Sequence, residues 1–176
     1  MVKGAQHACC GVVVLRCCGV AVLSGLGAAP RCEQFADPVP PGDELIVEVR
    51  ASSLKPVDKQ LASGSHFASS NDLPVICGTD GVGTLSDGTR GFFGGPRPPY
   101  GAMAERTVVR REFCFPLPEN IDDRVAADDI LIDALHKVLS HAASGELSID
   151  TEHVRLRDIE EAWGRDPQGR RLVVIP

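Results

Sequence analysis

The sequence predicts a mainly β fold with a few helices, an α+β class, and three observations carry this prediction. The 176 residues include 18 Gly and 13 Pro but only 5% aromatic residues, a composition typical of chains with many turns and short strands. Alternating apolar and polar residues appear in the first third, whereas helical spacing is confined to the last third. With 43% hydrophobic residues, the chain can bury one core.

The first half of the chain predicts strands joined by turns. Val20–Leu23 is a short apolar run closed by glycines and a proline, which indicates a strand and a turn. In residues 45–50, Leu, Val and Val alternate with Ile, Glu and Arg, so one face of this strand should be buried. Ser52–Phe67 is predicted as a loop with one helical turn at Asp58–Ala62, which Gly64 ends.

The glycine-rich middle of the chain predicts tight strands and bends. Asp87-Gly88 is a hairpin signal, because both residues tolerate the positive φ that the preferred two-residue turn requires. Ala102–Val109 is predicted as a further strand, and Phe113–Pro118 as an extended segment that leaves the β-rich part.

The last third predicts helices and a closing strand. Apolar residues recur at helical spacing between Asp128 or Asp129, which can cap the helix, and Gly145. Asp158 and Glu161 form a capping-box-like start of a second, short helix. Leu172–Ile175 is predicted to be the closing strand.

The charge and the cysteines exclude some classes of function. The formal net charge is -6 and no basic stripe is visible, so nucleic acid is excluded as a partner. An odd number of cysteines without framework spacing favours a reducing compartment, and we expect a cytoplasmic protein. No metal site is expected, because the Cys9-Cys10 and Cys17-Cys18 doublets lack a spacer and His136 and His141 lie on different helix faces.

The amino-terminal segment Met1–Ala29 weakly imitates a secretory signal. Arg16 interrupts its apolar run, and the stretches on either side are too short to span a bilayer. We therefore predict no membrane partner and interpret residues 1–19 as a disordered extension.

Five ordered segments resemble the medium-chain dehydrogenase/reductase superfamily. This resemblance implies a GroES-like, partly open β-barrel with carboxyl-terminal helices and a closing strand. It divides the chain into the extension 1–19, a GroES-like domain 20–125 and a carboxyl-terminal return 126–176. The segments that carry it are Gly42–Asp58, Leu73–Gly83, Tyr100–Glu105, Pro116–Ile121, and the two parts Gly145–Trp163 and Gly169–Val174 of the return.

The resemblance points to the zinc-free, quinone oxidoreductase-like branch. Zinc-dependent relatives place a cysteine in the loop corresponding to Leu54-Lys55 and a histidine-glutamate pair at Thr79-Asp80, and this chain has neither the cysteine nor the histidine. The implied activity is NADPH-dependent reduction of a quinone or enone. Asp122–Ala127 runs almost directly into the predicted helix, so the Rossmann domain is expected to be missing. We accordingly expect a truncated or inactive form that does not bind NADPH alone.

Four residues are candidates for a substrate or cofactor cleft. Lys55 and Gln60 occupy positions where zinc-free relatives often have an asparagine and a tyrosine, so both depart from the family's pattern. Lys55 either attracts a phosphate or polarises a carbonyl, or is an ordinary solvated lysine. Asp58 either belongs to the cleft or caps the following turn. Tyr100 either borders the cleft or only packs.

A different class of function stays open beside the enzyme. The alternative is a GroES-like binding or interaction module without catalysis, because surfaces that normally pack on a cofactor domain would be left apolar. A homo-oligomer is a possible assembly under this interpretation.

Overall fold

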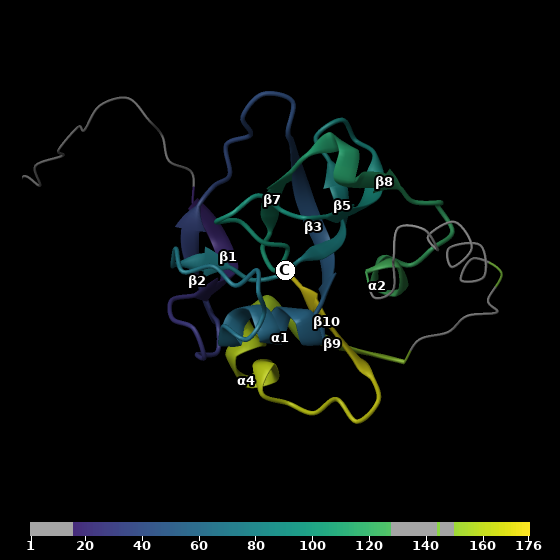
Figure 1. Ribbon diagram of the computed structural model, residues 1–176. Helices are drawn as coiled ribbons and strands as arrows, with labels where there is room; N and C mark the ends of the chain where they lie inside the picture. Colours follow the sequence, from purple (N-terminus) through teal and green to yellow (C-terminus); the bar gives the residue numbers. More distant parts are fainter. Residues whose placement is uncertain (1–15, 128–143, 145–149) are drawn as a thin grey trace, which may run out of the picture.

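The computed structural model describes residues 16–127, 144 and 150–176, and Figure 1 shows a smaller and a larger group of strands with short helices around them. Residues 1–15 of the predicted extension lie outside the described residues. So do the helix predicted from Asp128 to Gly145 and its two histidines, His136 and His141.

The smaller sheet has three strands in the order β2-β1-β4, all antiparallel. Its central strand is β1 (Arg16–Leu23), flanked by β2 (Arg31–Ala36) and β4 (Val75–Ile76). The predicted strand Val20–Leu23 is the buried part of β1, with every residue at most 4% exposed. Residues 16–19, predicted as part of the extension, also belong to this strand.

The larger sheet has seven strands in the order β8-β6-β5-β3-β10-β9, and β7 also pairs with β3. All pairs are antiparallel except β9 with β10, so the carboxyl-terminal segment joins the sheet through β10 beside β3. The strands are β3 (Leu45–Ser53), β5 (Asp80–Leu85), β6 (Arg90–Gly94), β7 (Arg106–Val109), β8 (Cys114–Pro116), β9 (Thr151–Arg155) and β10 (Arg171–Ile175).

The long strand β3 follows the predicted alternation. Leu45, Val47 and Val49 are at most 7% exposed, while Glu48 and Arg50 face solvent. This period of two is what a strand with one buried face requires. Its end is buried on both faces, where β3 lies between β5 and β10.

The helices are short. They are α1 (Pro56–Ser63), α2 (Asp123–Ala126) and α4 (Ile159–Trp163), with 3-10 turns at Arg111–Phe113 and Leu156–Asp158. Among the described residues, none of the helices combines the length and the apolar character that a membrane span requires.

One core cluster joins the two ends of the described chain. Ala21 of β1 and Leu54 pack in the same buried cluster as Ile159 and Ala162 of α4 and Leu172 of β10. All five side chains are at most 5% exposed. The carboxyl-terminal segment is therefore part of the core, and it packs against Leu54, which follows β3 and precedes α1.

The predicted fold class is confirmed: the structure is mainly β with a few short helices, and the strand order of its sheets is open. The helical turn predicted at Asp58–Ala62 is also confirmed, extended to the whole of α1, and Gly64 ends it at φ 81.

Several predicted details differ in the structure. The β5–β6 hairpin forms, but Gly88 (φ 87) has positive φ and Asp87 does not, so the preferred two-residue turn is absent. Asp87 Oδ1 instead accepts a hydrogen bond from the Thr89 amide at 3.0 Å. The strand predicted at Ala102–Val109 is regular only in β7, and Asp158 makes no side-chain cap on α4.

Candidate functional site

The candidate site begins where β3 turns into α1. Lys55 is the residue before Pro56, and its extended backbone (φ -102, ψ 159) is the conformation that a following proline favours. Pro56 then starts the helix, where its missing N–H is not needed. The Lys55 side chain therefore leaves the chain at a fixed point between a buried strand and a helix.

The Asp58 carboxylate fastens this point to the start of β5. Its Oδ2 accepts a hydrogen bond from the Lys55 amide at 2.8 Å, and its Oδ1 accepts one from the Thr79 amide at 3.1 Å. Asp58 is 2% exposed. One buried side chain thus holds together two segments that are 21 residues apart in the sequence.

Burial dominates the electrostatics of Asp58. Loss of hydration raises the pKa of its carboxyl to about 6, and the nearby Asp80 charge adds to this. The Lys55 amide, the Lys55 charge and the Thr79 bond act in the opposite direction but do not compensate. Perturbed carboxyl groups of this kind gather at functional sites, although structural clusters also have them.

Lys55 and Asp80 form a largely buried ion pair. Lys55 Nζ lies 2.5 Å from Asp80 Oδ1, and the two side chains are 17% and 19% exposed. Asp80 is further held by the Thr79 hydroxyl, which donates to Oδ2 at 3.2 Å, and by the Ser52 hydroxyl, which donates to the Asp80 carbonyl at 2.8 Å. Lys55 is therefore not an ordinary solvated lysine.

A basic hollow opens beside the Lys55–Asp80 pair. Its cavity volume is about 170 Å³, and four cationic residues line it: Lys55, Lys59, Arg170 and Arg171. Glu152 partly balances them, since its Oε2 lies 3.2 Å from Arg170 Nη2. Arginine and lysine side chains in such a cluster are the donors that phosphate groups prefer. We call this feature the basic hollow.

A mainly apolar pocket lies between α1 and β4, with Asp58 in its wall. Its cavity volume is about 140 Å³, and its walls come from the end of β1, from α1, from residues 68–70, from 75–79 and from 98–100. Asp58, Thr79 and Tyr100 are among the residues that line it. We call it the α1–β4 pocket.

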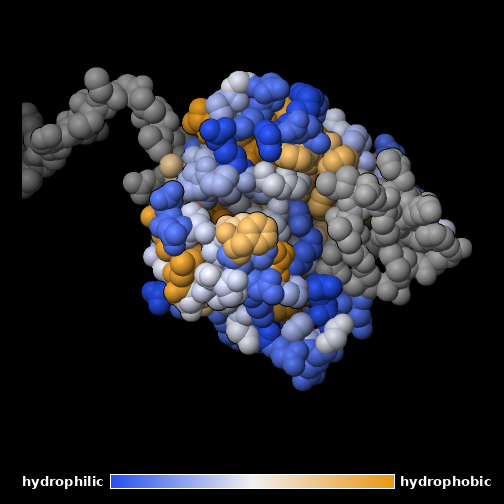
Figure 2. Space-filling view, in the orientation of Figure 1, coloured by the Kyte–Doolittle hydropathy of each residue, from blue (hydrophilic) through white to orange (hydrophobic). Residues whose placement is uncertain are grey.

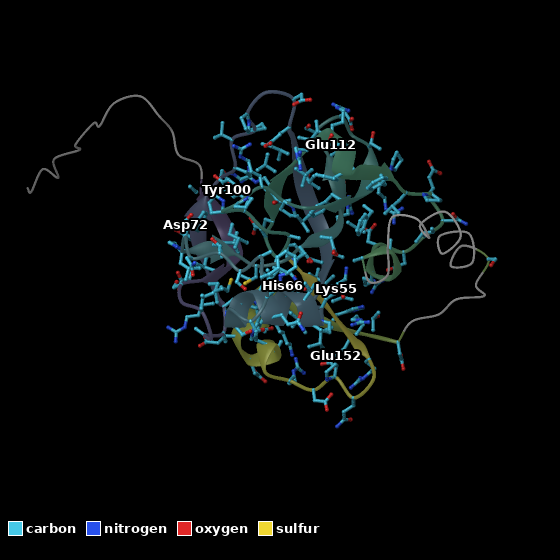
Figure 3. The ribbon with its side chains drawn as sticks, in the orientation of Figure 1. Lys55, His66, Asp72, Tyr100, Glu112 and Glu152 are labelled. Atoms are coloured by element: carbon cyan, nitrogen blue, oxygen red, sulfur yellow. The ribbon has the colours of Figure 1, made fainter. Side chains whose placement is uncertain are left out.

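The structure brings three of the four candidate residues to these features. Lys55 lies in the basic hollow, while Asp58 and Tyr100 both line the α1–β4 pocket. Figure 3 shows Lys55 beside α1 and Tyr100 on the side of β1 and β2. Gln60 is exposed on α1 and is not among the residues that line either feature; its carbonyl accepts hydrogen bonds from the loop after α1.

Tyr100 also packs. Its ring lies edge to face with Phe35, with ring centroids 6.1 Å apart, and its hydroxyl donates to the Asp37 carbonyl at 3.4 Å. Tyr100 therefore packs against Phe35 and also lines the α1–β4 pocket.

The cysteines of the site region are poor nucleophiles. Cys77 is buried beside the α1–β4 pocket, and burial raises the pKa of its thiol to about 12. Cys114 of β8, which lines neither feature, is half-buried, and burial raises the pKa of its thiol to about 11. Within residues 16–127, 144 and 150–176, no group of three or more His, Cys, Asp or Glu could hold a metal ion.

Sequence reasoning missed three contributors to the site. It mentioned Asp80 only at the position of a zinc ligand in related enzymes, and it included Arg170 and Arg171 only in the segment Gly169–Val174 that carries the resemblance. The spacing of Lys55, Asp80 and Arg170 carries no signal, because β5 and β10 bring them together only in the folded chain.

Comparison of the sequence with protein-family models and with curated proteins gives no match. Comparison of the structure with solved structures gives clear matches. The quinone oxidoreductase from Coxiella burnetii has 20% identity and a TM-score of 0.60, over 80% of this chain and 49% of that one. The quinone oxidoreductase from Thermus thermophilus, solved also with NADPH, has 22% identity and a TM-score of 0.58, over 81% and 48%.

A third structure matches over its whole length. A thermostable alcohol dehydrogenase from Pyrobaculum aerophilum has 10% identity and a TM-score of 0.72, covering 92% of this chain and 100% of that one. The chain spans about half the length of the two quinone oxidoreductases. Over the part that it spans, the chain has the fold of these quinone oxidoreductases and of this alcohol dehydrogenase, which confirms the resemblance at the level of the fold.

Proposed function

We propose that this chain carries the catalytic-domain part of a zinc-independent reductase that transfers a hydride from NADPH to a quinone or related enone. We further propose that it is cytoplasmic, and that the chain by itself turns over such substrates weakly. The observation that carries the proposal is the Lys55–Asp80 pair. Its largely buried cation lines the basic hollow, in a chain with the fold of quinone oxidoreductases.

The chemistry of the reaction suits a fixed cation. When a hydride adds to a quinone or an enone, negative charge develops on the carbonyl oxygen, and a preorganised donor stabilises it. The Lys55 ammonium has three N–H groups, and one of them lies against Asp80. The other two N–H groups are available to donate to a carbonyl oxygen, so Lys55 is the residue that we assign to this role.

The basic hollow fits the phosphates of NADPH in charge. Lys59 and Arg170 add to Lys55 and Arg171 there, and the volume of about 170 Å³ accommodates a phosphate group. NADPH, when bound, would supply the hydride. The described residues contain no strand–glycine turn–helix unit that could cradle the dinucleotide. They fit one end of the cofactor only, which supports weak binding and weak turnover by this chain.

The interaction-module alternative gains less support. The large apolar side chains that are exposed among the described residues, Leu26, Val39 and Phe67, come from three different loops. Figure 2 shows the apolar groups of one face as separate spots between polar ones. This is the usual surface of a folded domain rather than one continuous patch.

Two assays test the proposal. The first is titration of the full chain with NADPH, measured by cofactor fluorescence, and the second is a quinone turnover assay. We expect weak, salt-sensitive binding and slow turnover. Lys59→Gln with Arg170→Gln should weaken binding about fivefold per lost phosphate contact. Arg157→Gln removes an exposed arginine outside the basic hollow and should have no effect.

Three results would contradict the proposal. Binding that is unchanged in the Lys59 and Arg170 variants would remove the hollow as the phosphate site. Turnover that is unchanged in Lys55→Met would remove Lys55 from the reaction. Rapid, saturable quinone reduction by this chain alone would contradict the proposed weak activity.

A further inference from the structure

The α1–β4 pocket has walls that are mostly apolar. Leu61 of α1, Val75 and Ile76 of β4, Leu23 at the end of β1 and Pro98 all line it. The pocket is open to solvent, and residues of its wall, among them Ala68, Pro98 and Pro99, are exposed. A concave, mainly apolar surface with a few polar groups is the usual form of a small-molecule site.

The polar groups at the wall already have partners within the protein. Asp58 accepts the amides of Lys55 and Thr79, at 2.8 and 3.1 Å. Ser70 Oγ accepts the amide of Asp72 at 3.1 Å and donates to the Asp72 carbonyl at 3.4 Å.

The remaining two hydroxyls are also engaged. The Thr79 hydroxyl donates to Asp80 at 3.2 Å, and the Tyr100 hydroxyl donates to the Asp37 carbonyl at 3.4 Å. A ligand in this pocket therefore gains mainly apolar contact. A charged ligand would lose its hydration and find no new partner of opposite charge other than a carboxylate that is already bonded.

The volume limits the ligand to about one ring. The cavity of about 140 Å³ is close to that of an engineered apolar cavity of about 150 Å³ in another protein, which binds benzene. A six-membered ring fits such a space, whereas a larger ligand would have to extend into solvent.

We propose that the α1–β4 pocket binds a small uncharged compound with one six-membered ring, through apolar contact with Leu61, Val75 and Ile76. This inference goes beyond the proposed reduction, because the pocket shares no lining residue with the basic hollow and needs neither NADPH nor Lys55 Nζ. A ring bound there is held whether or not it is reduced.

Methyl NMR of the full chain tests this inference directly. Benzene and cyclohex-2-enone are titrated as neutral probes, and benzoate and benzylammonium as charged probes of similar size. We expect the neutral probes to shift the methyl signals of Leu61, Val75 and Ile76 in a saturable way. The charged probes should shift them much less.

Two variants close the pocket from different sides. Ala68→Trp adds an indole at an exposed position of the wall, and Leu61→Trp fills the cavity from α1; each should weaken benzene binding about tenfold or more. Val39→Trp adds the same indole at a residue that is 80% exposed and that lines neither feature. It should leave benzene binding unchanged.

The outcomes are distinct. Shifts that are absent, or spread over methyls of both sheets, overturn the pocket as a ring site, and so does unchanged benzene binding in both pocket variants. Benzylammonium or benzoate binding more tightly than benzene overturns the uncharged ligand class. NADPH binding measured in the same Ala68→Trp protein should stay unchanged, so failure of the ring site and failure of the proposed reductase site are told apart.

Discussion

Replacing Asp58 with asparagine should remove one contribution to the pH dependence of the free energy of unfolding. Asp58→Asn keeps the shape of the side chain and one acceptor oxygen but cannot ionise. The carboxyl pKa is raised from 3.8 to about 6 in the folded chain, so the folded state binds the proton more tightly than the unfolded state does. The protonated carboxyl is therefore compatible with burial, and the ionised one is disfavoured by it.

The shift sets both the size and the sign of the effect. A change from 3.8 to about 6 corresponds to about 3 kcal/mol. This stability is fully present below the unfolded pKa near 3.8, and it is lost as the pH rises through about 6. The free energy of unfolding of the wild type minus that of Asp58→Asn should therefore fall by about 3 kcal/mol between pH 3.5 and pH 7.5.

Urea unfolding of both proteins across this pH range measures the difference. Subtraction removes the other carboxyl groups, including Asp122, whose pKa is lowered to about 2 chiefly by the Arg124 side chain and acts with the opposite sign. A difference that stays flat would mean that Asp58 is not perturbed. A difference that rises with pH would mean that the two amide hydrogen bonds outweigh the loss of hydration, and the reasoning would be refuted.

Three further predictions concern the site and the core, each measured by urea unfolding at pH 7. Lys55→Met leaves the Asp80 carboxylate without its cation and should destabilise the chain by about 1–3 kcal/mol, and adding Asp80→Asn should recover part of this loss. Gly78→Ala should cost at least about 1 kcal/mol, because φ is 102 and a Cβ would lie 2.6 Å from the Met103 backbone nitrogen. Phe93→Ala should cost about 3–5 kcal/mol, since this side chain is 0% exposed.

The sequence predicted those elements whose pattern lies in neighbouring residues. The alternation in β3, the apolar run in β1 and the glycine that ends α1 each follow from neighbouring residues. β9 was not predicted, because Thr151–Arg155 contains one apolar residue, Val154, and no alternation. It is a strand through its parallel pairing with β10, and that partner lies elsewhere in the sequence.

The candidate site was predictable only in part for a similar reason. Lys55 and Asp58 lie in one loop that the sequence marks by its proline and its resemblance to a family. The partners that give them their properties come from β5 and β10. A lysine without a visible partner is best interpreted as solvated, and only the fold shows that the Lys55 side chain is 17% exposed against Asp80.

The Lys55–Asp80 pair is the source of positive charge in the reaction that we propose. The resemblance places these two residues in the segments where zinc-dependent relatives have metal ligands, and here the two side chains bond to each other. Asp58 fixes the backbones of Lys55 and Thr79, so hydrogen bonds within the protein hold these two segments together. In the proposed reaction a covalently attached ammonium provides the positive charge. Because the ammonium is tied to Asp80, the charge available to a carbonyl oxygen depends on the carboxylate partner as well as on the lysine.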